Sequence, residues 1–308
     1  MPQRVFLTGA SGFVGSAILK ELVRRGLAVN ALSNRRVPPA IEGEVKHFIA
    51  DVFESGALDG AMAGCDAAIH LIGIIQENPK EGITFERMHV EATRQVIEAA
   101  KRAGIKRFVQ MSAMGVRADA ETEYGRTKWR AEQIVRGSGL DWTIFRPSMI
   151  HGPKGEFMKM EAKWARKQSP PFLFMPYFGA GLLGLNARGR VQPIFVDEVA
   201  RAFVEAVGNS QSIGRIYELG GADRLTWPMM HRIASREIVG KKRLTLGIPA
   251  WYAKLVAAIV PGSLLPFNRD QVVMSLEDNS GDTADFVRDF GWQPMGFEQS
   301  LRGYVGLI

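Results

Sequence analysis

The sequence predicts an α/β fold in which a doubly wound parallel sheet is accompanied by a smaller, mostly helical region. Three observations predict it. A glycine-rich turn joins an apolar strand to a helix near residue 10, strand and helix patterns then alternate, and the alternation stops after Ser148. Alternation of this kind builds a parallel sheet with helices on both faces, and its strands end along one ligand-binding edge.

The glycine-rich turn has the sequence TGASGFVG, residues 8–15. The apolar residues 5–7 before it read as a buried strand, and the residues after it carry the apolar face of a helix. Glycines permit a sharp turn and close backbone approach, so amide groups at the helix start can hold a pyrophosphate. The residues expected to bind a dinucleotide here are Gly9, Ser11, Gly12, Phe13, Val14 and Gly15.

Further strands and helices are expected from hydrophobic periodicity. The clearest helix covers residues 85–103, and a second one covers residues 123–135. Short apolar runs bounded by turn residues predict strands. These runs cover residues 28–32, 45–50, 67–72, 107–111, 142–145 and 214–219.

After Ser148 the alternation of strand and helix patterns gives way to loops rich in proline, glycine and aromatic residues. Among these, Gly179, Gly181 and Gly184 suggest a flexible loop. Residues 190–196 and a helix over 198–207, with Asp197 as N-cap, are expected to return to the main sheet. The apolar stretch 244–267 is too short to span a bilayer and is read as a core helix, with a lipid-binding surface as the alternative. We therefore expect a dinucleotide-binding domain over 1–148 and 190–222, and a substrate-binding region over 149–189 and 223–308.

Composition narrows the function classes. The 308 residues carry a formal charge of +7, but the basic residues are scattered and no nucleic-acid-binding pattern appears. The five histidines are too dispersed to predict a metal site. A single cysteine, Cys65, and a first strand starting at residue 5 favour a cytoplasmic protein without a secretory signal.

The end of the second strand indicates which dinucleotide is preferred. An acidic residue that would bind a ribose 2′-hydroxyl is expected about twenty residues after the glycine turn. This chain instead has Ser33, Asn34, Arg35 and Arg36 there. Because Arg35 can pair with a 2′-phosphate, we expect NADP(H) to be preferred, with NAD(H) as the alternative.

A tyrosine and a lysine four residues apart form the candidate catalytic pair. Tyr124 and Lys128 share one face of the second predicted helix, and Ser112 ends the strand before it. A neighbouring ammonium favours the phenolate, so Tyr124 could exchange a proton during hydride transfer while Lys128 also bonds the ribose. His151 follows the Arg146–Pro147 turn and is read as a cleft residue or a structural histidine.

These motifs together resemble the short-chain dehydrogenase/reductase superfamily, in its extended or atypical branches related to NAD-dependent epimerases and dehydratases. The resemblance covers nearly the whole chain and implies a Rossmann-type fold. It rests on the glycine turn, on Tyr124 and Lys128, and on the sequences HLIG (70–73) and RPSMIHGP (146–153). It implies that Asp51 and Val52 lie by the adenine and that Leu71, Ile72 and Gly73 lie along the cofactor.

A narrower similarity is to bacterial relatives of the NAD(P)H-binding accessory subunit of respiratory complex I. It rests on the sequences starting MHVEATRQ (88), GRVQPIFV (189) and NRDQVVMS (268). In that group the cofactor is tightly bound and, in mitochondrial members, structural. The similarity implies contact with a respiratory complex or with a membrane.

One departure from the superfamily pattern bears on activity. The catalytic Ser or Thr of extended members follows the serine that matches Ser112, and this chain has Ala113 there. Two main readings remain: an NADP(H)-dependent oxidoreductase acting on a hydrophobic carbonyl or alcohol, and an NAD(P)H-binding structural or sensor protein. A nucleotide-sugar epimerase or dehydratase is a further alternative, and the sequence leaves the oligomeric state open.

Overall fold

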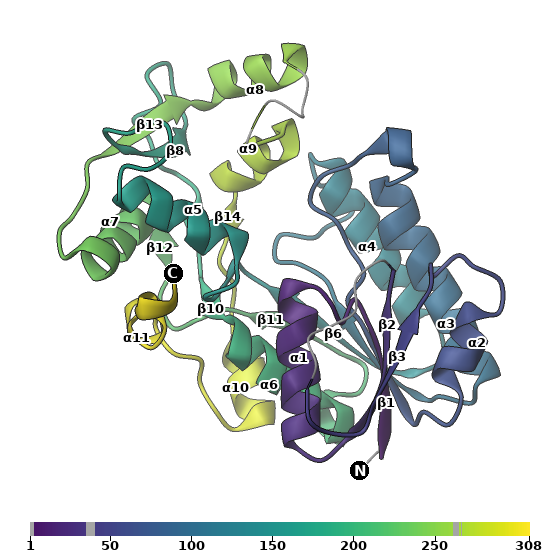
Figure 1. The fold of residues 1–308 in the computed structure, drawn as a ribbon. Helices are drawn as coiled ribbons and strands as arrows, with labels where there is room; N and C mark the ends of the chain where they lie inside the picture. The colour runs from purple at the N-terminus through teal and green to yellow at the C-terminus, as the bar shows by residue number, and fades with distance from the viewer. Residues whose placement is uncertain (1–2, 35–40, 261–264, 266) are drawn as a thin grey trace. The chain divides into compact units, whose positions relative to one another are not determined.

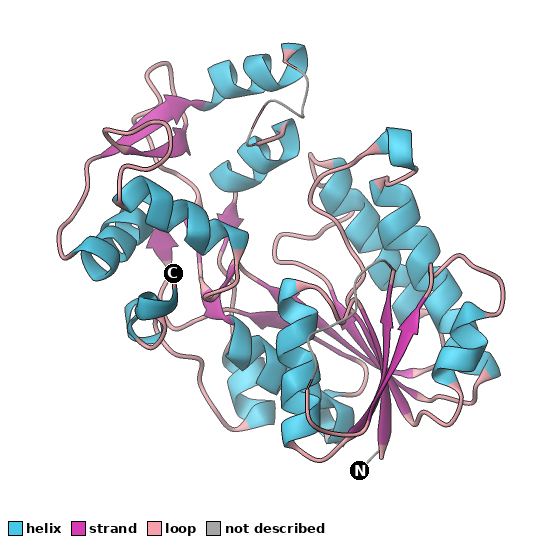
Figure 2. Cartoon of the chain, in the orientation of Figure 1, coloured by secondary structure: helices cyan, strands magenta, loops and turns pink. Residues whose placement is uncertain are grey.

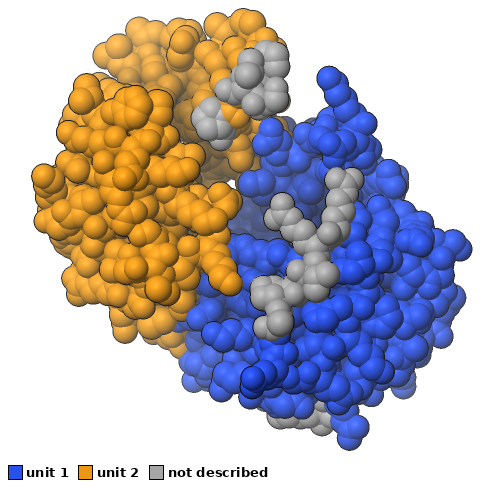
Figure 3. Space-filling model, viewed as in Figure 1, with its two compact units in different colours: residues 1–147, 196–219, 283–292 blue, residues 148–195, 220–282, 293–308 orange. Residues whose placement is uncertain are grey.

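The computed structural model describes residues 3–34, 41–260, 265 and 267–308. The chain forms two compact units, shown in Figure 3. Unit 1 contains residues 1–147, 196–219 and 283–292, and unit 2 contains 148–195, 220–282 and 293–308. Residues 148, 190–195 and 220–222, which we expected in the dinucleotide-binding domain, thus belong to unit 2, whereas residues 283–292, expected in the substrate-binding region, belong to unit 1.

Unit 1 is built on a seven-stranded sheet in the order β11-β6-β5-β4-β1-β2-β3, and every neighbouring pair in it is parallel. This is the doubly wound arrangement predicted from the sequence. Strand order reverses beside β1, and ligands of such sheets bind where the order reverses. The strands are β1 (Arg4–Thr8), β2 (Ala28–Ser33), β3 (Val45–Ile49), β4 (Ala67–His70), β5 (Arg107–Met111), β6 (Asp141–Pro147) and β11 (Arg215–Leu219).

Helices cover both faces of this sheet, as Figures 1 and 2 show. Helices α1 and α6 pack together on one face, whereas α2, α3 and α4 cover the other. The apolar residues of β1 and β2 are almost completely buried between the two layers. The helices of unit 1 are α1 (Phe13–Arg24), α2 (Ala57–Met62), α3 (Ala92–Arg102), α4 (Glu123–Arg136), α6 (Val196–Gly208) and α10 (Ala284–Phe290).

Two expectations for unit 1 need correction. The helix expected over residues 85–103 is α3 preceded by η2 (Glu86–Glu91), a turn of π-helix. Asp197 is not an N-cap, because α6 already begins at Val196 and the side chain of Asp197 is exposed.

Unit 2 has its own apolar core, formed by residues such as Met158, Met230 and Phe297. Residues 190–196 do not join the main sheet as expected. Two short strands, at 190–191 and 194–195, pair with other strands of unit 2, and Val196 begins α6. The strands are β7 (Ile150–His151), β8 (Met175–Gly179), β9 (Arg190–Val191), β10 (Ile194–Phe195), β12 (Leu225–Thr226), β13 (Thr245–Pro249) and β14 (Asp278–Asn279).

The helices of unit 2 include one that contradicts a prediction. The stretch 244–267 was read as a core helix, but it contains strand β13 and a helix whose large apolar side chains are mostly exposed. The described helices of unit 2 are α5 (Glu156–Ala165), α7 (Trp227–Val239), α8 (Ala250–Ile259), α9 (Arg269–Leu276) and α11 (Phe297–Arg302).

Candidate functional site: a dinucleotide cradle and a buried tyrosine–lysine pair

The glycine turn forms a cradle between β1 and α1. Gly9 has φ +70°, a conformation that favours glycine, and its amide donates to Leu32 O at 3.1 Å. A Cβ on Gly15 would lie 2.0 Å from Gly9 O, so only glycine fits there. Helix α1 starts after Gly12, which has no side chain to cap it. Amide groups at the helix start are thus available to an anion, and the residues present fit a pyrophosphate.

The loop after β4 lies against this cradle. A Cβ built on Gly9 would contact the side chain of Leu71 at 3.4 Å. The amide of Leu71 is fixed by Thr8 Oγ1 at 3.0 Å. The structure therefore brings together the glycine turn and the start of the predicted cofactor loop, Leu71, Ile72 and Gly73.

A cavity of about 390 Å³ opens beside the glycine turn. Three predicted residues line it: Ser11, Asn34 and Asp51. Asp51 Oδ1 accepts a hydrogen bond from Phe53 N at 3.0 Å, which fixes the turn after β3. Val52 is buried in the apolar core instead of facing the cavity. The remaining lining residues are Phe53, Ile74, Glu81, Gly82, Ile83, Arg87 and Met88.

Polar groups at the end of β2 and in the cavity lining are only partly those expected from the sequence. Ser33 is buried, and its hydroxyl has no hydrogen-bond partner among the described residues. Arg35, the predicted partner of a 2′-phosphate, lies outside the described residues. The guanidinium of Arg87 stacks 4.4 Å above the Phe53 ring, so it supplies a positive charge in the cavity that the sequence did not suggest.

Tyr124 and Lys128 are both buried on α4 and lie four residues apart, as predicted. Lys128 Nζ donates to Met111 O at 3.3 Å, and a Cβ on Gly73 would approach Nζ to 2.8 Å. The ammonium thus lies between the end of β5 and the cofactor loop. The Tyr124 ring meets the His89 ring edge to face, with centroids 5.3 Å apart.

Burial shifts the pKa values of both members of this pair. Desolvation raises the pKa of Tyr124 to about 12, so the lowering that we expected from the nearby ammonium is absent. Desolvation also lowers the pKa of Lys128 to about 8, against the opposing influence of Glu132. At pH 7 the pair is therefore a neutral phenol and a mostly charged ammonium.

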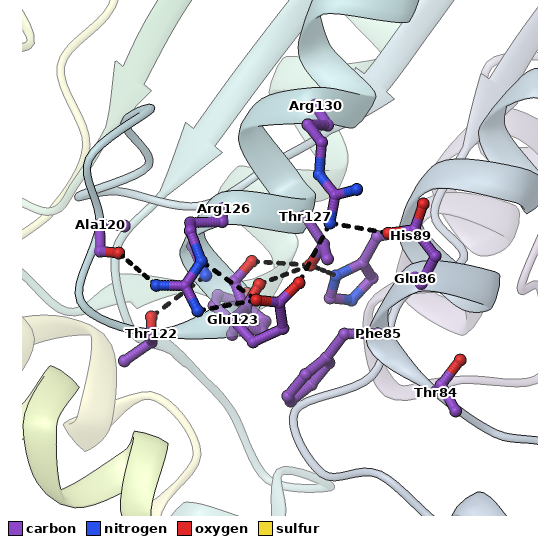
Figure 4. Close-up of polar contacts among 12 residues, drawn as sticks. Thr84, Phe85, Glu86, His89, Ala120, Thr122, Glu123, Arg126, Thr127 and Arg130 are labelled. Carbon is purple, nitrogen blue, oxygen red and sulfur yellow. Dashed lines mark hydrogen bonds and ion pairs between the residues drawn. The ribbon is translucent and has the colours of Figure 1, made fainter.

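The start of α4 is held in place by a cluster of side chains, shown in Figure 4. Thr122 caps the helix by accepting from Gly125 N at 3.1 Å. Arg130 pairs with Glu123 on its own helix at 3.0 Å and with Glu86 on η2 at 2.7 Å. These contacts fix η2 against the turn of α4 that carries Tyr124.

His89 on η2 is a site residue that sequence reasoning missed. The hydroxyl of Thr127 donates to backbone carbonyls of its own helix, so it accepts the Nδ1 proton of His89 at 2.8 Å. Nε2 is then free to accept from Ile74 N at 3.2 Å. Burial lowers the pKa of His89 to about 2, which keeps the ring neutral. His89 therefore links α4 to the residue that follows the cofactor loop, and its contact with Thr127 is drawn in Figure 4.

His70, at the end of β4, forms a second neutral link. Thr93 Oγ1 donates to His89 O at 2.6 Å, so it accepts from Nε2 of His70 at 3.3 Å. Nδ1 of His70 then accepts from Thr8 Oγ1 at 2.9 Å. Burial lowers the pKa of His70 to about 3. One chain of hydrogen bonds thus connects β1, β4, η2 and α4 beneath the cofactor loop.

Ser112 is buried at the end of β5, and its hydroxyl donates to Glu132. Glu132 also pairs in a bidentate way with Arg146, at 2.6 and 2.8 Å. Glu132 continues the i, i+4 series of Tyr124 and Lys128, a spacing that could have suggested it. The Ser112 hydroxyl therefore belongs to a buried ion pair in this structure.

His151 lies in unit 2, where it is completely buried. Its Nδ1 is 2.8 Å from the hydroxyl of Tyr304, and its Nε2 is 3.3 Å from that of Ser300. Burial lowers its pKa to about 3. These contacts are those of a structural histidine, the second of the two readings that the sequence left open.

The fold and the cradle define a dinucleotide-binding protein of the Rossmann type. A family model described as NAD(P)H-binding matches residues 9–164, and the chain belongs to this family. It is an NAD(P)-binding protein like the short-chain dehydrogenases and reductases, as the sequence motifs indicated.

Two relatives illustrate the range of this group. The chain is 27% identical to the mitochondrial NADH dehydrogenase [ubiquinone] 1 alpha subcomplex subunit 9 of Arabidopsis thaliana, over 71% of this chain and 54% of that protein. It therefore spans about half the length of that relative. It is 29% identical to a ceramide reductase of Caulobacter vibrioides, over 78% of this chain and 72% of that protein.

Solved structures confirm the fold. UDP-glucose 4-epimerase of Thermus thermophilus, solved as a complex with NAD, superposes with a TM-score of 0.72. The match covers 99% of this chain and 98% of the epimerase at 20% sequence identity. At this identity the likeness concerns the fold alone.

Proposed function

We propose that this protein is an NADP(H)-dependent oxidoreductase that acts on a hydrophobic carbonyl or alcohol. The observation that carries this proposal is the burial of Tyr124 and Lys128 on one face of α4, with Lys128 Nζ against Gly73 of the cofactor loop. A lysine is costly to bury, so its position at a ligand-binding edge indicates a function. A relative named as a ceramide reductase supports an apolar substrate.

Tyr124 and Lys128 can supply the proton that a carbonyl reduction requires. NADPH, when bound, supplies the hydride. Tyr124 keeps its proton at neutral pH, because burial raises its pKa to about 12, and it can donate that proton to an oxygen that gains negative charge. The Lys128 ammonium then stabilises the phenolate and can bond the ribose. Ser112 is assigned a positioning role, because its hydroxyl is bonded to Glu132.

Preference for NADP(H) is proposed from the charges around the cavity. Its lining includes Asn34 where a carboxylate would discriminate against a 2′-phosphate, and it includes the guanidinium of Arg87. Arg35 follows directly in the sequence. The matched test compares NADPH and NADH affinities of the wild type with those of Arg87→Ala and Arg35→Ala. Both variants should lose affinity for NADPH about tenfold while keeping that for NADH, and tighter NADH binding by the wild type would contradict the proposal.

The reaction is tested by following NADPH consumption with a panel of apolar ketones, quinones and long-chain carbonyls. Tyr124→Phe should lower kcat by at least a hundredfold while leaving NADPH affinity nearly unchanged. Tyr217→Phe in β11 of unit 1 is the matched control; the hydroxyl of Tyr217 bonds Asp289 and the residue is not part of the cavity lining, so this variant should retain full activity. Turnover that survives Tyr124→Phe would refute the assignment of Tyr124.

A second candidate is a structural or sensor protein that holds NAD(P)H without turnover. It is favoured by Ala113 and by the engagement of the Ser112 hydroxyl with Glu132, which together leave no free hydroxyl at these two positions. The relative in the NADH dehydrogenase complex supports contact with a respiratory complex. Tight nucleotide binding with no turnover on any substrate would select this candidate.

The nucleotide-sugar alternative has the weakest support, since Ala113 replaces the hydroxyl used by extended family members. Interconversion of UDP-sugars without net consumption of NAD(P)H would establish it. For each of these candidates we propose a cytoplasmic location, with the chain peripheral to the inner face of a membrane.

A further inference from the structure

Unit 2 presents an apolar surface whose large side chains are strongly exposed. Most large apolar side chains of α8 face away from the core, whereas its two buried residues are the small Ala250 and Ala253. A helix of a globular protein ordinarily shows the reverse pattern. The apolar face, as we call it, consists of Leu182, Leu183, Leu185, Leu244, Leu246, Trp251, Tyr252, Leu255 and Ile259, which are between 43% and 78% exposed.

The elements that carry the apolar face are joined to one another. Strands β8 and β13 pair in parallel from Met175 to Gly179, and α8 follows β13 directly. Figure 1 shows β8, β13 and α8 together within unit 2. The indole of Trp251 donates to Leu182 O at 3.1 Å, which joins the helix to the leucine-rich loop.

The leucine-rich loop is held in a defined conformation. It was expected to be flexible, but Ala180 and Asn186 close it through two backbone hydrogen bonds of 2.8 and 3.3 Å. A Cβ on Gly179 would lie 1.7 Å from Gly184 O, so the two arms of the loop touch. The three leucines are therefore presented to solvent by an ordered turn.

The two chain segments that carry the apolar face contain basic residues and no acidic ones. No Asp or Glu occurs between Glu161 and Asp197, or between Glu237 and Asp270, the two segments that contain β8, β13 and α8. Of the 39 Lys and Arg residues of the chain, ten lie in these segments, five in each. The excess of basic residues is thus concentrated in the chain segments that carry the exposed apolar side chains. These residues are Lys163, Arg166, Lys167, Arg188, Arg190, Lys241, Lys242, Arg243, Lys254 and Arg269.

We propose that the apolar face docks on the surface of an anionic lipid bilayer, with α8 and the leucine-rich loop entering the headgroup region. Leucines would enter the acyl boundary, Trp251 and Tyr252 suit the interface, and the basic residues would meet anionic headgroups. Among the described residues no helix is both long and apolar enough to traverse a bilayer. The contact is therefore peripheral.

The charges favour a membrane over a second copy of the chain. An isologous dimer through this face would bring two sets of these basic residues together with no acidic residue of the same segments to oppose them. An anionic bilayer gains from the same charges, by about fivefold in affinity per lysine near the surface. The proposal does not depend on the reaction proposed above.

Flotation with vesicles tests this proposal on the full chain. Vesicles of phosphatidylcholine with about a third phosphatidylglycerol should carry the wild type, and pure phosphatidylcholine should carry at least tenfold less. Leu182→Ser/Leu183→Ser should lower partitioning at least tenfold, because both side chains are at the tip of an exposed loop. Lys241→Gln/Lys242→Gln should lower it about 25-fold, at about fivefold per lysine, and reduce its dependence on salt.

Matched controls distinguish binding through the apolar face from nonspecific binding of exposed leucines and lysines to lipid. Leu307→Ser removes a leucine that is 75% exposed elsewhere in unit 2, and Lys101→Gln/Lys106→Gln removes two exposed lysines of unit 1. Both controls should partition like the wild type, and every variant should keep its NADPH affinity, which reports folding independently of lipid. Absence of flotation, or equal flotation of the leucine variant and the wild type, would overturn the proposal. A lipid-free dimer that the leucine variant dissociates would assign the face to a second copy and overturn it as well.

Discussion

Lys128 gives the sharpest test of the site, because its buried charge should favour cofactor binding while it lowers the free energy of unfolding. Desolvation lowers its pKa from 10.5 to about 8, and that difference corresponds to about 3 kcal/mol. Below pH 8 the ammonium is charged in the folded and unfolded states, so the full cost of burial is present. Between about pH 8 and 10.5 the folded protein binds fewer protons than the unfolded chain, and stability rises with pH.

Lys128→Met removes this cost with an unbranched apolar side chain that is one atom shorter. It also removes the hydrogen bond to Met111 O at 3.3 Å, a loss of about 1 kcal/mol. We therefore expect the variant to be about 2 kcal/mol more stable than the wild type at pH 7, and less than 1 kcal/mol more stable at pH 9.5. Its NADPH affinity should fall at least tenfold, since the ammonium that contacts the cofactor loop is gone.

Urea unfolding followed by circular dichroism, at pH 7 and pH 9.5, measures both stabilities. Lys101→Met on α3 is the control, because this lysine is exposed and its replacement should change stability by less than about 0.5 kcal/mol at either pH. The reasoning fails if Lys128→Met is less stable than the wild type at pH 7. It fails equally if the gain in stability is the same at both pH values.

Three further predictions concern the rest of the site. Gly12→Ala places a Cβ 3.2 Å from Gly9 O and should weaken NADPH binding at least tenfold with a small loss of stability, whereas Gly15→Ala places one at 2.0 Å and should impair folding. Titration with NADPH and thermal melting measure the two effects separately. Equal effects of the two variants would count against the cradle. Glu132→Gln should lower the free energy of unfolding by about 3–5 kcal/mol, because it leaves Arg146 without its charged partner; a change under 1 kcal/mol in urea unfolding would contradict this. Burial lowers the pKa values of His70 and His89 to about 3 and 2, so both rings should remain neutral in NMR titrations from pH 8 to 5. The free energy of unfolding should fall as the pH drops below about 6.5, because only the unfolded chain then binds protons on these rings. A ring that titrates near pH 6.5 would be inconsistent with the network.

Local patterns were sufficient to predict the nucleotide-binding part of the fold. The turn from β1 to α1 depends on glycines and on periodicity within some twenty residues, so the sequence contains its signal directly. Tyr124 and Lys128 are likewise related by helical spacing alone. Each of these features arises from residues close in sequence.

Features that depend on tertiary contacts could not be read in the same way. The Glu132–Arg146 pair joins a helix to a strand, and His89 faces Thr127 because η2 is a π-helical turn whose register shifts the side chains. In unit 2, β9 and β14 have two residues each, which is too short for a periodic pattern, and they pair across a long stretch of chain. The stretch around α8 was misread because hydrophobicity alone does not reveal whether a helix is covered.

The central claim is that backbone amides at the β1–α1 turn hold the diphosphate of a pyridine nucleotide. Isothermal titration of the purified chain with NADPH and with NADH, at modest salt, tests it most directly. The account predicts saturable binding of NADPH at micromolar concentration or below, and a loss of that binding in Gly12→Ala. Failure of both nucleotides to bind the folded wild type would contradict it.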